Sequence, residues 1–441
     1  MTESTSAHST SFGVAAQPTK PSSAASSAAA GAVAAGGVYQ RLVLDSLRKM
    51  TAGCLRLDLP DGATMVIGTP GAATSAHIRV LNPAFFQKCV LFGDVGFGES
   101  YVDGDWETDS ISNVIAWAVL NVENSPAMSG SKARSLALNL LKSYNRVLHQ
   151  LRPNSMATSR RNIAEHYDLG NEFYRLWLDR TMTYSSAYFT APEQSLELAQ
   201  VAKYEALCRK LHIQASDHVL EIGSGWGGFA CHAAKHYRCR VTTVTISEQQ
   251  YIFAKERVFN AGLTDRVDVQ LRDYRLLEGQ YDKVVSIEMM EAIGDRYLET
   301  YFAKIHAVLK PGGLVGVQYI TVPDSRHAEL KRGVDWIQKH IFPGSLLLSV
   351  GRVNEALSRT GDLFLHDLED IGSSYARTLH AWWENFNAQL PAVRSLGFDE
   401  RFIRKWNYYL QYCEAAFASR NISVVQAVYT RPNNRALHEE W

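Results

Sequence analysis

The ten residues from Val219 to Gly228 carry the clearest chemical signal in the chain: Val-Leu-Glu-Ile-Gly-Ser-Gly-Trp-Gly-Gly. An apolar stretch that predicts a buried strand runs into a glycine-rich turn, and a helix is expected to begin near Trp226. Gly223 and Gly225 have no Cβ, so the backbone there can turn sharply and approach a ligand closely. Together with Gly228 they also satisfy the dinucleotide fingerprint G-x-G-x-x-G, which alone is a weak signal. The turn is therefore the first candidate for a cofactor site.

Two further features separate a nicotinamide dinucleotide from S-adenosylmethionine. The next predicted strand ends Val244-Thr245-Ile246-Ser247, without the terminal Asp or Glu that would bind an NAD ribose. Glu221 stands two residues before the first glycine, where class I methyltransferases commonly hold the methionine end of their cofactor. Both features favour S-adenosylmethionine.

Composition sets outer limits on the function. A chain of 441 residues suggests about two or three domains and can bury a large core. Lys plus Arg and Asp plus Glu are both 45, so no overall charge attracts nucleic acid, and no nucleic-acid partner is expected. The six cysteines lack CxxC pairs, which is typical of reduced thiols in a cytoplasmic protein. No apolar run approaches the ~18–20 residues of a membrane-spanning helix.

The chain divides by its residue content into five segments. Residues 1–37 are Ser, Thr, Ala and Gly with few large apolar side chains, and predict a disordered tail. Residues 38–122 predict a small α+β domain, and residues 123–157 a polar linker containing one helix, from Lys132 to Leu151. Residues 158–432 predict the largest domain, and 433–441 a short tail.

Alternating strands and helices in the largest domain predict an α/β fold with a doubly wound, seven-stranded sheet. Residues 322–360 interrupt the alternation. Glu329 to His340 reads as an amphipathic helix and Ile341 to Leu348 as an apolar loop, which together suggest a cap over a ligand cavity. The expected strands are 218–222, 240–246, 267–271, 281–288 and 313–320, with two more near 363–368 and 423–430.

Six strings in this order resemble the cyclopropane-fatty-acyl-phospholipid synthases, a lipid-modifying family that includes the mycolic acid cyclopropane synthases. The resemblance runs from about residue 84 to 432 and implies a class I S-adenosylmethionine-dependent methyltransferase fold. Its strings are Gly98-Glu-Ser-Tyr-Val-Asp-Gly-Asp-Trp106, His166-Tyr-Asp-Leu-Gly-Asn171, Thr181-Met-Thr-Tyr-Ser-Ser-Ala-Tyr-Phe189, Glu221-Ile-Gly-Ser-Gly-Trp-Gly-Gly228, Ser286-Ile-Glu-Met-Met-Glu-Ala-Ile-Gly294 and Ile341-Phe-Pro-Gly344.

The resemblance also implies which residues hold the cofactor. Taken from the residues alone, Thr245 and Gln250 would be an ordinary strand end and helix start. The implied contacts are Tyr184 and Ser185 with the carboxylate end of methionine, Gly223 and Gly225 with the adenosyl group, Thr245, Ile246 and Gln250 with the ribose, and Asp273 and Tyr274 with the adenine.

The reaction implied is methyl transfer from a sulfonium to the double bond of a cis-unsaturated acyl chain in a phospholipid. Attack leaves a carbocation, and a base must remove a methyl proton so that a cyclopropane ring can close. In the family, bicarbonate bound beside a glutamate is thought to be that base. Glu291 matches the glutamate, while the backbone of Ile287 and the hydroxyl of Tyr375 match other bicarbonate contacts. The plainer interpretation of Glu291 is a surface carboxylate that caps a helix.

Two positions depart from the commonest family pattern. Ser186 stands where these synthases usually have Cys, and Gln318 where they usually have His. Both can donate hydrogen bonds to an anion, but the imidazole that changes charge near neutral pH is lost. We expect a cyclopropane product. A methylene- or methyl-branched product remains the alternative, and a lipid-binding protein that has lost its chemistry the second.

A membrane-bound substrate implies a docking surface, expected at the inner face of the membrane. The candidates are the loop Ile341 to Leu348 and an apolar segment of the N-terminal domain, although both could be internal packing surfaces. A homodimer remains open. No metal is expected, because His232 and His236 lack a third ligand. The apolar segment consists of Phe85, Phe86, Val90, Leu91 and Phe92.

Overall fold

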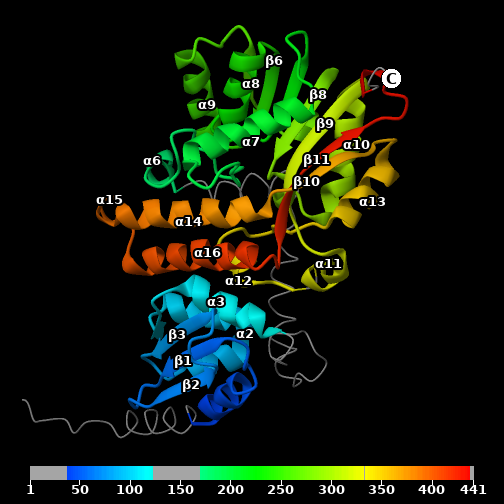
Figure 1. Cartoon of the computed structure of the whole chain (residues 1–441). Helices are drawn as coiled ribbons and strands as arrows, with labels where there is room; N and C mark the ends of the chain where they lie inside the picture. Colours follow the sequence, from blue (N-terminus) through cyan, green and yellow to red (C-terminus); the bar gives the residue numbers. More distant parts are fainter. Residues whose placement is uncertain (1–36, 123–168, 332, 438–441) are drawn as a thin grey trace, which may run out of the picture.

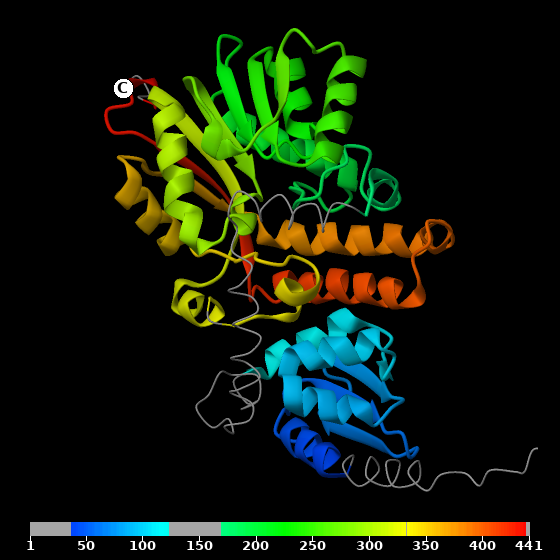
Figure 2. The ribbon, with the colours of Figure 1, turned by 180° about the vertical axis from the view of Figure 1, so that it is seen from behind.

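The computed structural model describes residues 37–122, 169–331 and 333–437 (Figure 1). The predicted tail, apart from its last residue, and the predicted linker helix lie outside the described residues. Three parts follow one another in space: a domain built on a large sheet, a pair of long helices, and a small N-terminal domain (Figures 1 and 2). In the described part of the chain, no helix is both long and apolar enough to cross a membrane.

The large sheet has seven strands in the order β10-β11-β9-β8-β5-β6-β7. β11 is antiparallel to both of its neighbours, and the pairs among β9, β8, β5, β6 and β7 are parallel. The strand order reverses between β5 and β8, which is where open α/β sheets bind ligands. All seven strands lie where the sequence predicted them: β5 (His218–Ile222), β6 (Arg240–Thr245), β7 (Val267–Leu271), β8 (Tyr281–Ile287), β9 (Leu309–Thr321), β10 (Phe364–Asp370) and β11 (Ser423–Thr430).

Helices cover both faces of this sheet, which confirms the predicted class I methyltransferase fold. One apolar cluster joins the sheet to α7, α8 and α9, and a second joins it to α10 and α13. Serine side chains cap the N-termini of α7, α9 and α13 and satisfy backbone N–H groups there. The helices are α7 (Leu196–Lys210), α8 (Gly228–Tyr237), α9 (Glu248–Asn260), α10 (Leu298–Val308) and α13 (Val350–Thr360), with the shorter α6 (Asn171–Arg175), η2 (Tyr274–Leu276), η3 (Met290–Ala292), η4 (Asp295–Tyr297) and η5 (Arg435–Leu437).

The single helix predicted from Glu329 to His340 is wrong. The structure has two short helices, α11 (Asp324–Leu330) and α12 (Trp336–His340). Asp335 and Gln338 form a capping box, in which each side chain bonds to the backbone of the other residue. This box starts a new helix at Trp336 and so separates the two.

A helical hairpin is inserted between β10 and β11. It consists of α14 (Gly372–Ala388), α15 (Leu390–Ser395) and α16 (Glu400–Ala418), and it lies between the sheet domain and the N-terminal domain (Figure 1). Its aromatic side chains belong mainly to the core. Trp382, Phe386, Trp406, Tyr408 and Tyr409 are all buried in one cluster with the N-terminal domain.

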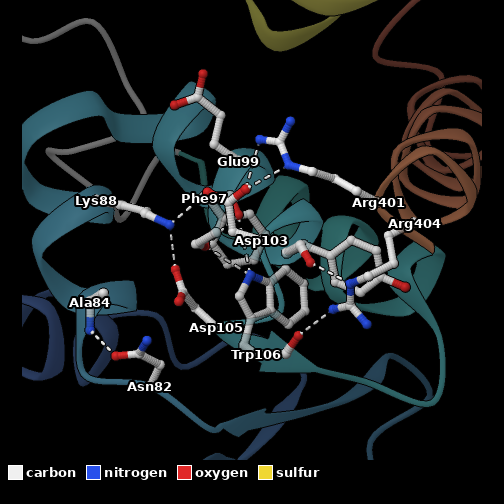
Figure 3. A network of polar contacts seen from close by, with 12 residues as sticks. Asn82, Ala84, Lys88, Phe97, Glu99, Asp103, Asp105, Trp106, Arg401 and Arg404 are labelled. Carbon is white, nitrogen blue, oxygen red and sulfur yellow. Dashed lines mark hydrogen bonds and ion pairs between the residues drawn. The ribbon is translucent and has the colours of Figure 1, made fainter. Parts of the chain in front are cut away.

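The N-terminal domain is attached to α16 of the hairpin. Arg404 donates to the backbone carbonyls of Tyr101 and Trp106, and Arg401 forms an ion pair with Asp103 (Figure 3). The small sheet has the order β2-β1-β3-β4. The elements of the domain are β1 (Cys54–Asp58), β2 (Thr64–Gly68), β3 (Ser75–Val80), α2 (Ala84–Val102), β4 (Trp106–Glu107) and α3 (Ile111–Leu120).

Part of the predicted docking surface is buried. Phe85 and Phe86 are 2% and 0% exposed in the core of the N-terminal domain, and Ile341 and Leu348 of the loop are 3% and 1% exposed in core clusters. These four side chains pack internally, so the prediction is wrong for them. Phe92, at 37% exposed, is the one clearly exposed residue of the predicted apolar segment.

Candidate active site

The glycine turn after β5 has the geometry of a ligand cradle. Gly223 and Gly225 have φ values of 98° and 47°, and the N–H groups of Gly223 and Ser224 both donate to the carbonyl of Val244, each at 3.0 Å. A Cβ added at Gly225 would meet no atom of the described residues within 4 Å, so the turn faces open space within this part of the chain. The Ser224 hydroxyl is buried without a hydrogen-bond partner among the described residues. Both observations fit a bound cofactor that fills the space and completes the bonding.

Glu221 lies directly beneath this turn. Its Oε2 accepts a hydrogen bond from Thr243 Oγ1 at 2.5 Å, and its side chain is buried. Burial raises the pKa of this carboxyl to about 8, against the smaller opposing effect of the Thr243 bond. The cofactor-free protein therefore holds a neutral acid here. A cationic ligand group beside it would favour the ionised form.

The burial of Glu221 predicts a specific pH dependence of stability. Its pKa is raised on folding, so the stabilisation it gives is full in acid and is lost as the pH rises from about 4.5 to about 8. Between pH 6 and pH 8, the free energy of unfolding of the cofactor-free wild type should fall by ~2 kcal/mol more than that of Glu221→Gln. Urea denaturation measures it. The exposed Glu256→Gln variant is the control and should follow the wild type; equal slopes for all three proteins would contradict the assignment.

The other predicted nucleoside contacts gather at the same edge of the sheet. Thr245 ends β6 and donates to Gln250 Oε1 at 2.9 Å, while Ile246 follows it half-buried. Asp273 follows β7, and its carboxylate is ion-paired with Arg275 at 2.6 Å. Tyr274 lies beside it, half-buried. These residues follow the carboxyl ends of β6 and β7, on the same side of β5 and at the same edge of the sheet as the glycine turn.

The segment that carries Tyr184 and Ser185 is held by two buried polar side chains of α7. Lys203 Nζ donates to Ser185 Oγ at 2.6 Å, and Gln200 Nε2 donates to the Ser185 carbonyl at 3.0 Å. The Tyr184 hydroxyl bonds to that of Tyr409 on α16 at 2.8 Å. Neither Gln200 nor Lys203 was predicted from the sequence. Both lie on the face of α7 that packs inward, and a polar residue at such a position is the sequence signal that could have identified them.

Ser186, Gln318 and Tyr375 are brought together as predicted, but around Glu288 rather than Glu291. Glu288 Oε1 accepts from the Ser186 backbone N–H and from Gln318 Nε2, both at 2.8 Å. Glu288 Oε2 accepts from the Tyr375 hydroxyl at 2.8 Å. The sequence analysis did not single out Glu288. We call this arrangement the carboxylate pocket.

The backbone beneath the pocket is fixed by the sheet. Ile287 is aligned with Gln318 in the β8–β9 pairing, and the N–H of Glu288 donates to the Gln318 carbonyl at 2.7 Å. Gln318 Oε1 in turn accepts from Gln426 of β11 at 3.1 Å. Three neighbouring strands therefore set the position of the glutamine that binds the carboxylate.

Glu291 lies on the adjoining turn, in a different environment. Its Oε1 accepts from the N–H of Ile320 at 2.5 Å, and its Oε2 is buried without a hydrogen-bond partner among the described residues. Burial, and then the charge of Glu288, raise the pKa of Glu291 to about 8. Burial also raises the pKa of Glu288, although the charge of Lys203 and three hydrogen bonds oppose that rise. Of the two acids, Glu288 is therefore the one whose charged form receives more support from its surroundings.

Aromatic rings pack against one another beside the carboxylate pocket, and we call Tyr184, Phe342, Tyr375 and Trp382 the aromatic wall. The ring of Tyr184 lies 5.3 Å from that of Trp382 and 6.2 Å from that of Phe342, centroid to centroid. The ring of Tyr375 lies 6.1 Å from that of Trp382. Aromatic faces next to a buried carboxylate stabilise a positive charge on an apolar substrate.

The two histidines on α8 take no part in this site. His232 bonds to Glu205 at 3.2 Å, and its ring lies 4.7 Å from that of His236. Within residues 37–122, 169–331 and 333–437, no group of three His, Cys, Asp or Glu side chains could hold a metal ion.

Comparison with known proteins adds an independent line of evidence. The family model described as mycolic acid cyclopropane synthetase matches residues 154–427. Tuberculostearic acid methyltransferase UfaA1 of Mycobacterium tuberculosis is 37% identical over 391 residues, covering 84% of this chain and 86% of its own. The cyclopropane-fatty-acyl-phospholipid synthase of Escherichia coli K12 is 35% identical over 393 residues, covering 87% and 97%. The structure of mycolic acid cyclopropane synthase CmaA1 complexed with SAH and CTAB matches with a TM-score of 0.58 and 29% identity, over 62% of this chain and 98% of that one.

Proposed function

Because the chain belongs to the mycolic acid cyclopropane synthetase family and is an S-adenosylmethionine-dependent methyltransferase, we propose that it modifies the cis double bond of unsaturated phospholipid acyl chains. One carbon is transferred to the double bond, and the product is a cyclopropane. The observation that carries this proposal is the carboxylate pocket beside an aromatic wall. A pocket of this kind suits a reaction that passes through a carbocation, an intermediate that methyl transfer to nitrogen or oxygen does not form.

Different residues of this chain bind the cofactor and align the substrate. When bound, S-adenosylmethionine supplies an electrophilic methyl group on a sulfonium. Tyr184, Ser185 and Glu221 would hold its methionine end, and the side chains after β6 and β7 its nucleoside. An alkene is a poor nucleophile, so the aromatic wall contributes mainly by aligning the double bond with the methyl carbon. The same wall excludes water from the cation.

The phospholipid substrate requires contact with a membrane surface. Each CH₂ of an acyl chain costs about 0.8 kcal/mol if it leaves the bilayer for water, so the chain must pass directly into an apolar passage. The name of the Escherichia coli relative supports a phospholipid substrate. We place the contact at the inner face of the membrane. The remaining candidates for the docking surface are Phe92 and the half-buried Val90, Leu91, Leu346 and Leu347.

Lipid analysis tests the proposal. Expression in bacteria rich in oleate or vaccenate, and lacking a synthase of their own, should yield acyl chains heavier by one CH₂. Proton NMR of the same extract should show the upfield protons of a cyclopropane ring. A Glu288→Gln culture is the control and should lack the new species. A folded, cofactor-binding wild-type protein that gives no mass gain would contradict the proposal and favour a lipid-binding protein without chemistry.

A methylene- or methyl-branched chain is the second candidate product. Two observations favour it: the name of the Mycobacterium tuberculosis relative, and Gln318 in place of the histidine usual in cyclopropane synthases. The mass gain of a methylene product equals that of a cyclopropane. Olefinic rather than upfield ring protons in the NMR spectrum would identify it.

A further inference from the structure

We propose that Glu288 is the base of this reaction and fills the place expected for bicarbonate, so that the enzyme works without a free anion. This inference rests on the proposed function and deepens it. Glu288, which was not predicted from the sequence, then accepts the methyl proton. A side chain of the protein thus does what a bicarbonate ion from solution was expected to do.

The hydrogen-bond donors around Glu288 are already occupied. Ser186 N–H has one hydrogen, given to Glu288, and Tyr375 has one hydroxyl hydrogen, also given to Glu288. The two hydrogens of Gln318 Nε2 go to Glu288 Oε1 and to the Ser186 carbonyl, at 2.8 and 3.1 Å. The Ser186 hydroxyl donates to the Ala187 carbonyl at 2.9 Å, so the side-chain donors that were expected to hold bicarbonate, on Ser186, Gln318 and Tyr375, are all in use. A second anion would meet a carboxylate instead of a free donor, so these residues do not fit bicarbonate.

The backbone of Glu288 has an unusual conformation. Its φ is +47°, in the left-handed region that residues with a side chain seldom adopt. Strain of this kind costs about 1–3 kcal/mol and is concentrated at functional sites. Glycine would adopt this conformation freely, but it would leave the carboxylate pocket empty. The strain at Glu288 is therefore best explained by a function of its carboxylate in the pocket.

Glu288 and Glu291 differ in the groups that surround their carboxyls. Two carboxyl groups this close do not both ionise readily, and hydrogen bonds decide which one does. Three hydrogen bonds favour the charged form of Glu288. Lys203 favours it too when it is protonated, although burial lowers the pKa of Lys203 to about 7. Glu291 receives one backbone hydrogen bond and faces the charge of Glu288. Glu291 thus remains a neutral neighbour that shapes the pocket.

The step balances with these groups alone. The π electrons of the double bond would form a carbon–carbon bond to the methyl as its bond to the sulfonium sulfur breaks, and the sulfur would leave as a thioether with that electron pair. The other carbon of the former double bond becomes cationic. A Glu288 oxygen takes one proton from that methyl group. The electron pair of the broken C–H bond closes the ring onto the cationic carbon. The substrate has then gained CH₂, and Glu288 holds the proton, which it later releases to water.

Purified wild-type protein tests the inference in buffer freed of carbon dioxide, with labelled S-adenosylmethionine and unsaturated phospholipid vesicles. Added bicarbonate should leave its turnover unchanged. Glu288→Gly should lower turnover by ~10²–10⁴-fold, the usual effect of losing a general base. Added bicarbonate or formate should then restore part of the activity, because the vacated pocket regains its donors. Glu288→Gln, which still fills the pocket, should be equally slow and show no rescue.

Thermal melting gives a second measurement that is independent of activity. Glycine relieves the strain at position 288, so Glu288→Gly should fold, and bicarbonate should raise its melting temperature but not that of the wild type. Turnover of the wild type that depends on bicarbonate would overturn the inference and leave the proposed function intact. Near-normal turnover of Glu288→Gly without any anion would do the same. A wild type inactive on every unsaturated lipid would overturn both.

Discussion

Glu288→Gln is expected to reduce kcat by ~10²–10⁴-fold, because an amide has no basic oxygen with which to accept the methyl proton. Glu291→Gln is expected to reduce it by less than about tenfold, because glutamine reproduces the shape and the donor of a neutral acid. Both variants should bind S-adenosylmethionine as the wild type does. Initial rates on vesicles and cofactor titrations measure the two quantities separately.

The order of the two effects decides between two interpretations. The resemblance to cyclopropane synthases assigned the central role to Glu291, whereas the hydrogen bonds assign it to Glu288. A large loss in Glu291→Gln with near-normal turnover in Glu288→Gln would restore the first interpretation. It would also show that the carboxylate pocket is structural.

Lys203→Met is expected to shift the acid limb of the pH–rate profile upward by about one pH unit, equivalent to a tenfold lower rate in acid. The charge of Lys203 opposes the effect of burial and lowers the pKa of Glu288. Without it, Glu288 keeps its proton to higher pH, and the fraction in the basic form falls. At high pH the rate should return toward that of the wild type.

Gln200→Leu is the matched control for this experiment. Gln200 and Lys203 lie on the same helix and both bond to Ser185, but only Lys203 can carry a charge. If Lys203 only positions the segment that contains Ser185, both variants should weaken cofactor binding and neither should move the pH profile. That outcome would remove Lys203 from the electrostatics of the pocket.

The sequence predicted most of the fold because its signals are local. The strands of the large sheet are marked by apolar runs and turn residues, and the glycine turn after β5 by its spacing. The predicted helix from Glu329 to His340 failed because the capping box at Asp335 interrupts a periodic pattern. The buried positions of Phe85 and Leu348 depend on packing against segments distant in the chain.

The residues of the site were predicted better than their arrangement. Ser186, Gln318 and Tyr375 come from three distant segments, and the resemblance correctly placed them together. Which acid they surround depends on the backbone of one tight turn, where a positive φ directs the side chain of Glu288 into the pocket. No spacing rule encodes that torsion, so the sequence pointed to Glu291 instead.

The central claim is that this enzyme adds a methyl carbon to a double bond and then removes a proton from that same carbon. The most direct test uses purified protein, unsaturated phospholipid vesicles and S-adenosylmethionine with a fully deuterated methyl group. Mass spectrometry of the acyl chains should show a product that retains two of the three deuterium atoms. A product that retains all three, with a hydrogen lost from the chain instead, would contradict the claim.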